Sequence, residues 1–125
     1  EVLGCNIARE HLPRYGFSAP EIEQICGMIM ATKIPQSPRN PLEQIICDAD
    51  LDYLGRDDFF SIGSSLYEEL KAYKVLETEE TWNRLQVGFL EKHAFFTETN
   101  KRRRSPQKSK YLDTLKEIVA GYEKK

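Results

Sequence analysis

The chain has 125 residues, of which 40% are apolar and 30% are charged, and its formal net charge is -2. This length suits one domain with its own core, and the composition excludes both a disordered chain and a membrane protein. The small net charge offers no overall attraction to nucleic acid or anionic lipid, so such a partner would need a local patch.

Two helices are predicted near the start of the chain. Apolar residues recur at helical spacing over residues 2–12, and Pro13 ends the pattern. The next helix is predicted over residues 18–32, because Ser18 is a good N-cap and Glu21 stands three positions later, as in a capping box.

A loop and a third helix follow. The loop KIPQSPRNP contains three prolines in nine residues. Asn40 as N-cap and Pro41 at the first helical position predict a helix over residues 41–54, which Gly55 would end. The spacing of Leu42 and Ile45 with later apolar residues predicts that they lie on the buried face of this helix.

The rest of the chain predicts three more helices. Asp57 would cap one that extends to residue 73, Thr78 would cap a strongly amphipathic one, and Pro106 would open the last. No stretch alternates as a strand does, and there is no internal repeat. We therefore expect an all-α protein of about six helices that forms one domain, residues 1–125.

The acidic segment, Asp48 to Asp52, is the feature that local physics explains least. It places Asp48, Asp50 and Asp52 near the C-terminal end of a helix, where the helix dipole disfavours anions. Asp50 borders the predicted apolar face, and Asp48 and Asp52 form a like-charged i,i+4 pair. Either a hard cation relieves this arrangement, or Asp50 pairs with an arginine such as Arg14 or Arg39 and the other two are solvated.

The segment from residue 8 to residue 70 resembles the C-terminal part of an HD-domain phosphohydrolase. The resemblance lies in LPRYGFSAPEIEQICGMIMATKIPQSPRNPLEQIICDADLDYLGRDDFF, and DADLDYLG is its most specific part. The later GFLEKHAFFT also looks like a downstream helix of this family. The resemblance implies a helical bundle, with a partial HD-like region over residues 1–75 and a helical extension over residues 76–125.

The same resemblance implies a divalent metal held by one histidine, an adjacent His-Asp pair and a distant aspartate. Asp50, in Ala49-Asp50-Leu51, matches the aspartate ligand, and Asp48 matches a neighbouring acidic position that supports the site without binding the ion. The chain has no His-Asp pair and only two histidines. We expect His11 on the surface and His93 in packed surroundings, and we expect the family's other ligands to lie upstream of Glu1.

The function implied by the resemblance is hydrolysis of a phosphate ester or nucleotide by the complete protein. A metal ion in such a site activates water and polarises a phosphoryl oxygen. This chain alone, with one ligand, would be inactive and would bind little or no metal. The alternative is a helical interaction or regulatory module on an HD-like scaffold that performs no chemistry.

Partners and compartment follow from the remaining features. Cys5, Cys26 and Cys47 are predicted to be reduced and buried, as in a cytoplasmic protein. The basic run that begins with Lys101–Arg104 is expected to be a solvated connection, and no membrane partner is expected. The alternatives are that the run docks an anionic substrate or partner, or that Arg102, Arg103 and Arg104 contact nucleic acid. If covering helices are missing, exposed apolar helix surface would favour a homo-oligomer, and a phosphorylated small molecule is the expected substrate.

Overall fold

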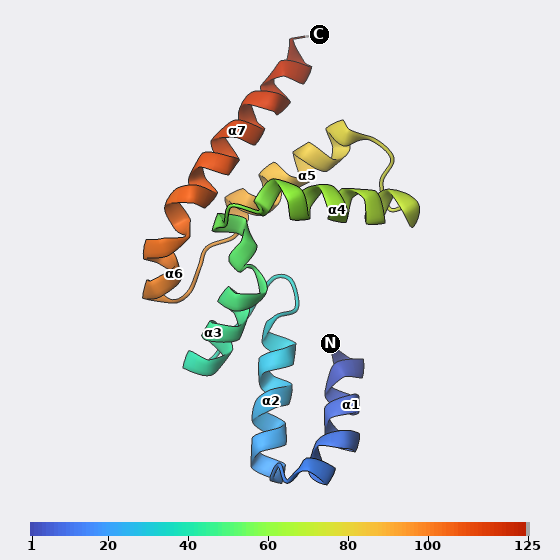
Figure 1. The fold of residues 1–125 in the computed structure, drawn as a ribbon, viewed down its shortest axis with the longest axis vertical. Coiled ribbons are helices and arrows are strands. Elements are labelled where there is room, and N and C mark those ends of the chain that lie inside the picture. The colour runs from blue at the N-terminus through green and yellow to red at the C-terminus, as the bar shows by residue number, and fades with distance from the viewer. Residues whose placement is uncertain (125) are drawn as a thin grey trace. The chain divides into compact units, whose positions relative to one another are not determined.

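The structure is a computed structural model that describes residues 1–124, and within them it is all-helical, as predicted (Figure 1). Seven α-helices and two short 3₁₀ helices make up this part of the chain, and it contains no strand. The helices are α1 (Val2–His11), η1 (Leu12–Tyr15), α2 (Ala19–Ala31), α3 (Pro41–Asp50), η2 (Asp52–Gly55), α4 (Phe59–Ala72), α5 (Glu79–Lys92), α6 (Glu98–Arg103) and α7 (Ser105–Glu123).

The chain divides into two compact units, residues 1–51 and the residues from Asp52 onward. The predicted single domain, with an HD-like region over residues 1–75, stays a prediction, and the division at Asp52 lies inside that region. No helix within residues 1–124 has both the length and the apolar character needed to cross a bilayer.

The N-terminal unit is built on the hairpin of α1 and α2, with α3 packed against α2. The predicted capping box at Ser18 is present: its Oγ accepts from the Glu21 N–H at 3.2 Å, and the Glu21 carboxylate accepts from the Ser18 N–H at 2.9 Å. Gly16 ends η1 with a φ of 89°, which only glycine adopts without strain. The core of the hairpin consists of Cys5, Ala8, Ile22 and Cys26, with Leu12 and Ile29 packed against them.

The buried face of α3 differs from the predicted one. Leu42 and Ile45 are exposed, whereas Glu43 and Cys47 are buried. Glu43 tolerates burial because its carboxylate accepts from the Arg39 N–H at 3.0 Å and from the amide of the N-cap residue at 2.9 Å. These bonds to the charged form lower the pKa of Glu43, the bond from the Arg39 backbone most of all.

The C-terminal unit packs α5 along α7 and holds η2 against α7 (Figure 1). An aromatic cluster joins α4 to α7, since the Phe59 and Tyr111 rings stack with centroids 4.5 Å apart and the Phe60 ring meets Tyr111 edge-on at 5.1 Å. The basic run is not the irregular connection that was predicted, because its first part is helix α6. The hydroxyl of Thr97 caps this helix by accepting from the Asn100 N–H at 3.2 Å, and its basic residues complement the C-terminal dipole.

Candidate functional site: the acidic segment

The three aspartates of the acidic segment have three different surroundings. Asp48 is buried within α3, Asp50 is the exposed last residue of α3, and Asp52 is the first residue of η2. The helix ends at Asp50 rather than continuing to Leu54 as predicted, so the last aspartate belongs to the next element. The like-charged helical pair expected between Asp48 and Asp52 therefore does not form within one helix.

Asp52 is a structural anchor of the C-terminal unit. Its Oδ1 accepts from Arg104 Nε at 2.9 Å and from Asn100 Nδ2 at 3.0 Å, and Arg56 Nη1 lies 3.6 Å from its other oxygen. The side chain is only 19% exposed. Charge-assisted bonds of this kind are among the stronger ones in proteins. Asp52 therefore ties η2 to α6 and to the start of α7, and the alternative in which Asp52 is solvated is wrong.

Two neighbours of Asp52 strengthen the same junction. Gly55, expected only to stop a helix, lies so close to Arg104 that an added Cβ would be 2.3 Å from the Arg104 carbonyl oxygen. The hydroxyl of Tyr111 donates to the Arg56 carbonyl at 2.6 Å. The sequence that follows the acidic segment therefore serves to dock α6 and α7.

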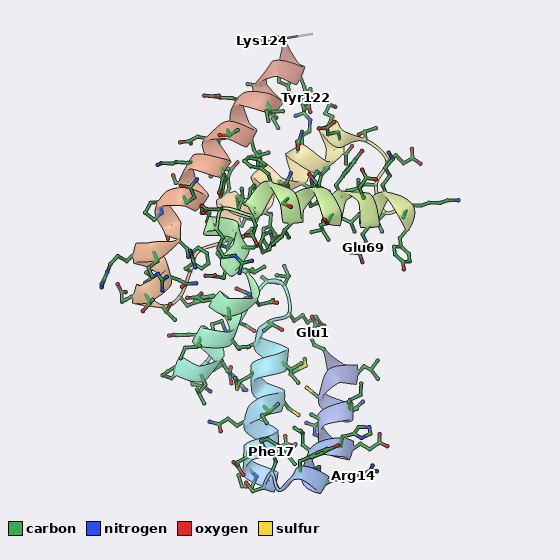
Figure 2. The ribbon with its side chains drawn as sticks, in the orientation of Figure 1. Glu1, Arg14, Phe17, Glu69, Tyr122 and Lys124 are labelled. Carbon is green, nitrogen blue, oxygen red and sulfur yellow. The ribbon has the colours of Figure 1, made fainter. Side chains whose placement is uncertain are left out.

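Asp50 differs from the other two aspartates because no side chain of its own unit binds its carboxylate. Within residues 1–51 its carboxylate has no hydrogen-bond or ion-pair partner, and it pairs with neither arginine proposed from the sequence. Arg39 instead bonds Glu43, with Nε 3.4 Å from the carboxylate, and Arg14 lies in the turn between α1 and α2 (Figure 2). Asp48, by contrast, is buried and engaged in an interaction.

The thiol of Cys47 lies close enough to Asp48 and Asp50 for their charges to affect its pKa. It is fully buried and donates to the Ala31 carbonyl at 3.2 Å. Burial raises its pKa, and the negative charges of Asp48 and Asp50 raise it further. The thiol is therefore protonated and inert at neutral pH.

The other two thiols face each other across the hairpin of the N-terminal unit. Cys5 Sγ donates to the Cys26 carbonyl at 3.5 Å, and Cys26 Sγ donates to the Cys5 carbonyl at 3.7 Å. Burial is the main cause of a raised pKa at Cys26. All three cysteines are free and buried, which confirms the prediction.

The histidines lie where the sequence placed them. His11 ends α1 and is exposed, 4.0 Å from the carboxylate of Glu10. His93 follows α5, where its ring stacks on Phe89 at 6.3 Å and meets Phe95 edge-on at 4.6 Å. Neither belongs to a cluster with the aspartates.

The side chains present do not make a complete metal site. Among residues 1–124, no group of three or more histidine, cysteine, aspartate or glutamate side chains is arranged to hold an ion. Structural and catalytic metal sites need at least three protein ligands in most cases. The described residues therefore supply no coordination sphere around Asp50.

The N-terminal unit contains a cavity of about 660 Å³ that was not predicted from the sequence. It is lined by apolar residues such as Val2 and Met30, and by two charge pairs. In one of these pairs the Arg9 guanidinium bonds both carboxylate oxygens of Glu23, at 3.0 and 3.2 Å, which lowers the pKa of Glu23. Each pair is neutral overall, and Lys33 also lines the cavity, so the lining carries one formal positive charge in excess.

Several side chains of the basic run already have partners within the C-terminal unit. Lys101 pairs with a glutamate of its own helix at 3.3 Å, and Arg104 bonds the acidic segment. Lys108 donates to the backbone carbonyl that follows α5, and burial lowers its pKa. The remaining arginines of the run, Arg102 and Arg103, are exposed.

Comparisons with protein-family models, with curated proteins and with solved structures find no match to this chain. The class that the structure defines is that of an all-α protein with two compact helical units. The resemblance to the HD superfamily stays a prediction from the sequence around DADLDYLG.

Proposed function

We propose that this chain is an HD-superfamily phosphohydrolase-like domain in which Asp50 provides one carboxylate ligand of a divalent-metal site. The observation that supports this proposal is the separation of the three aspartates. Asp48 and Asp52 are engaged, whereas Asp50 is exposed and unpaired within its own unit. Asp50 is also the position that matches the family's last metal ligand.

The electrostatics of α3 favour a cation at this position. An aspartate in the last turn of a helix is disfavoured by roughly 0.3–1 kcal/mol, because it meets the negative end of the helix dipole. A divalent ion on the Asp50 carboxylate would offset this term. Since no group of three or more candidate ligands is arranged for an ion within residues 1–124, the others would come from residues outside this range.

The test is the metal content of the protein as its gene encodes it. We expect Asp50→Ala to lower the Mn²⁺ bound at equilibrium dialysis by about 10-fold or more, since a single ligand loss leaves an incomplete site. Asp113, an exposed aspartate on α7, offers a matched control, and Asp113→Ala should bind as much Mn²⁺ as the unaltered protein. Equal binding by the two variants would remove Asp50 as a ligand.

Hydrolytic activity should depend on Asp50 in the same way as metal binding. The encoded protein should hydrolyse a generic phosphate ester such as bis(p-nitrophenyl) phosphate only with metal, and Asp50→Ala should abolish this hydrolysis. The 125-residue chain alone should show none. Hydrolysis that survives Asp50→Ala would contradict the assignment.

A second candidate is the non-catalytic interaction module, and the exposed apolar residues of the N-terminal unit favour it. Val2, Leu3 and Ile7 on α1 are 63%, 71% and 50% exposed, and Leu42 and Ile45 on α3 are 43% and 56% exposed. Exposed apolar helix surface of this kind favours association. In this function the chain would form a homodimer through these helices, and Leu3→Lys together with Ile45→Lys should make it monomeric in light scattering. A chain that is monomeric without these changes would argue against this candidate.

A further inference from the structure

The C-terminal unit contains a cavity of about 420 Å³ between α4, α5 and α7. Four aromatic side chains from these three helices line it: Phe60 and Tyr67 from α4, Trp82 from α5 and Tyr122 from α7. The Tyr67 and Trp82 rings lie 6.3 Å apart and are tilted by 39°. Figure 2 shows Tyr122 near the C-terminal end of α7. The volume and the aromatic lining of this cavity are those of a small-molecule site.

The charges of the lining have one sign. Glu68 and Glu79 line the cavity, and no lysine, arginine or histidine does. Both glutamates are exposed on their helices. The lining itself therefore presents two glutamates, and the nearest cations, Lys71 and Arg84, lie over the Tyr67 and Tyr122 rings.

The polar groups of the wall bond one another. Asn83, which is buried, donates from Nδ2 to the Tyr122 hydroxyl at 3.0 Å, and Gln86 donates from Nε2 to Asn83 Oδ1 at 3.3 Å. This network fixes the side chains between α5 and α7. The polar side chains of the wall are therefore hydrogen-bonded to one another.

The aromatic rings at this site already attract cations. Lys71 Nζ lies 5.7 Å from the centroid of the Tyr67 ring, and Arg84 Cζ lies 5.8 Å from that of Tyr122. The indole of Trp82 is the strongest cation-π acceptor among the aromatic side chains. Within residues 1–124, no lysine or arginine lies over the Trp82 ring, and Trp82 lines the cavity.

We propose that this cavity binds a small organic cation with a quaternary ammonium group. Aromatic faces and nearby carboxylates form the usual recognition pattern for such a group, because the ring quadrupole attracts the cation without a hydrogen bond. The site lies in the C-terminal unit and uses no residue of the acidic segment. It is independent of the metal site proposed at Asp50.

The only tryptophan of the chain is a built-in probe, because it lines the cavity. Titration with choline at constant ionic strength should change Trp82 fluorescence and reach saturation. The neutral carbon isostere 3,3-dimethylbutan-1-ol should bind roughly 2- to 30-fold more weakly, which is the range expected from the cation-π attraction. Equal affinities for the two compounds would reduce the site to an apolar cavity and overturn the proposal. No saturable change with choline or tetramethylammonium up to about 10 mM would also overturn it.

Variants distinguish the contribution of the carboxylates to choline binding from that of the aromatic rings. Glu68→Gln with Glu79→Gln should weaken choline binding several-fold while leaving the binding of the isostere unchanged. Glu117→Gln, at an exposed position on α7 outside the cavity, is the matched control and should change neither. Tyr67→Leu keeps an apolar wall and should weaken choline more than the isostere, with folding verified by circular dichroism. Choline binding that is insensitive to all of these changes would contradict the assigned cavity.

Discussion

Replacing Gly55 by alanine should destabilise the C-terminal unit, because the added Cβ would lie 2.3 Å from the Arg104 carbonyl oxygen. It would also lie 2.6 Å from the Arg104 Cβ and 2.8 Å from its carbonyl carbon. Ordinary contacts to a Cβ begin near 3.4 Å, so η2 and the Arg104 backbone would have to separate by about 1.1 Å. Neither partner is a flexible side-chain end that could turn away.

The cost has two parts. Overpacking of this kind typically costs about 1–3 kcal/mol. Separation would also stretch the 2.9 Å bond from Arg104 to Asp52 beyond hydrogen-bonding range, and such charge-assisted bonds contribute about 1.5–3 kcal/mol. Because the two effects overlap, we expect Gly55→Ala to lower the free energy of unfolding by roughly 2–4 kcal/mol.

Urea denaturation followed by Trp82 fluorescence measures this change, because Trp82 lies in the C-terminal unit and reports its unfolding. With a slope of about 1 kcal/mol per molar urea, the midpoint should fall by about 2 M or more. Gly88→Ala is the matched control, since α5 leaves nothing within 4 Å of an added Cβ there. It should raise stability by about 1 kcal/mol through helix propensity. A midpoint for Gly55→Ala that equals or exceeds the unaltered value would refute the close approach.

Three further outcomes are expected. Tyr111→Phe should cost the C-terminal unit about 1–3 kcal/mol in the same urea assay, because it leaves the Arg56 carbonyl without its 2.6 Å bond. The lowered pKa of Glu43 should stabilise the fold above the carboxyl's ordinary pKa of 4.5, and this term should be lost as the pH falls through the lowered value. Glu43→Gln should therefore flatten that acid dependence of thermal unfolding in circular dichroism, and an unchanged profile would argue against it. Because burial raises the pKa of the Cys26 and Cys47 thiols, both should react with iodoacetamide much more slowly than in urea, and equal rates would contradict their burial.

Helix starts were predictable because their signals are local. Ser18 with Glu21, and Asn40 with the proline that follows it, satisfy the first N–H groups of α2 and α3 with side chains within four residues. The same reasoning missed α6, which has only six residues. A helix this short is marginal in isolation and depends on packing, here against α7.

The buried face of α3 shows why apolar spacing alone was insufficient. Spacing favoured Leu42 and Ile45, yet both are exposed and Glu43 is buried. The carboxylate of Glu43 is buried with its bonds satisfied by the loop that precedes the helix, including the Arg39 N–H. The geometry of that loop cannot be derived from the periodicity of the helix.

The sequence by itself determined that the chain is helical, where most helices begin, and that three aspartates stand where a helix dipole opposes them. The tertiary structure decided what each aspartate does. Asp52 is bonded by Arg104, which lies 52 residues further along the chain, whereas Asp50 is left open in its own unit. Local spacing cannot distinguish these outcomes, because the partner of a buried or bridging carboxylate is supplied by packing between elements distant in sequence.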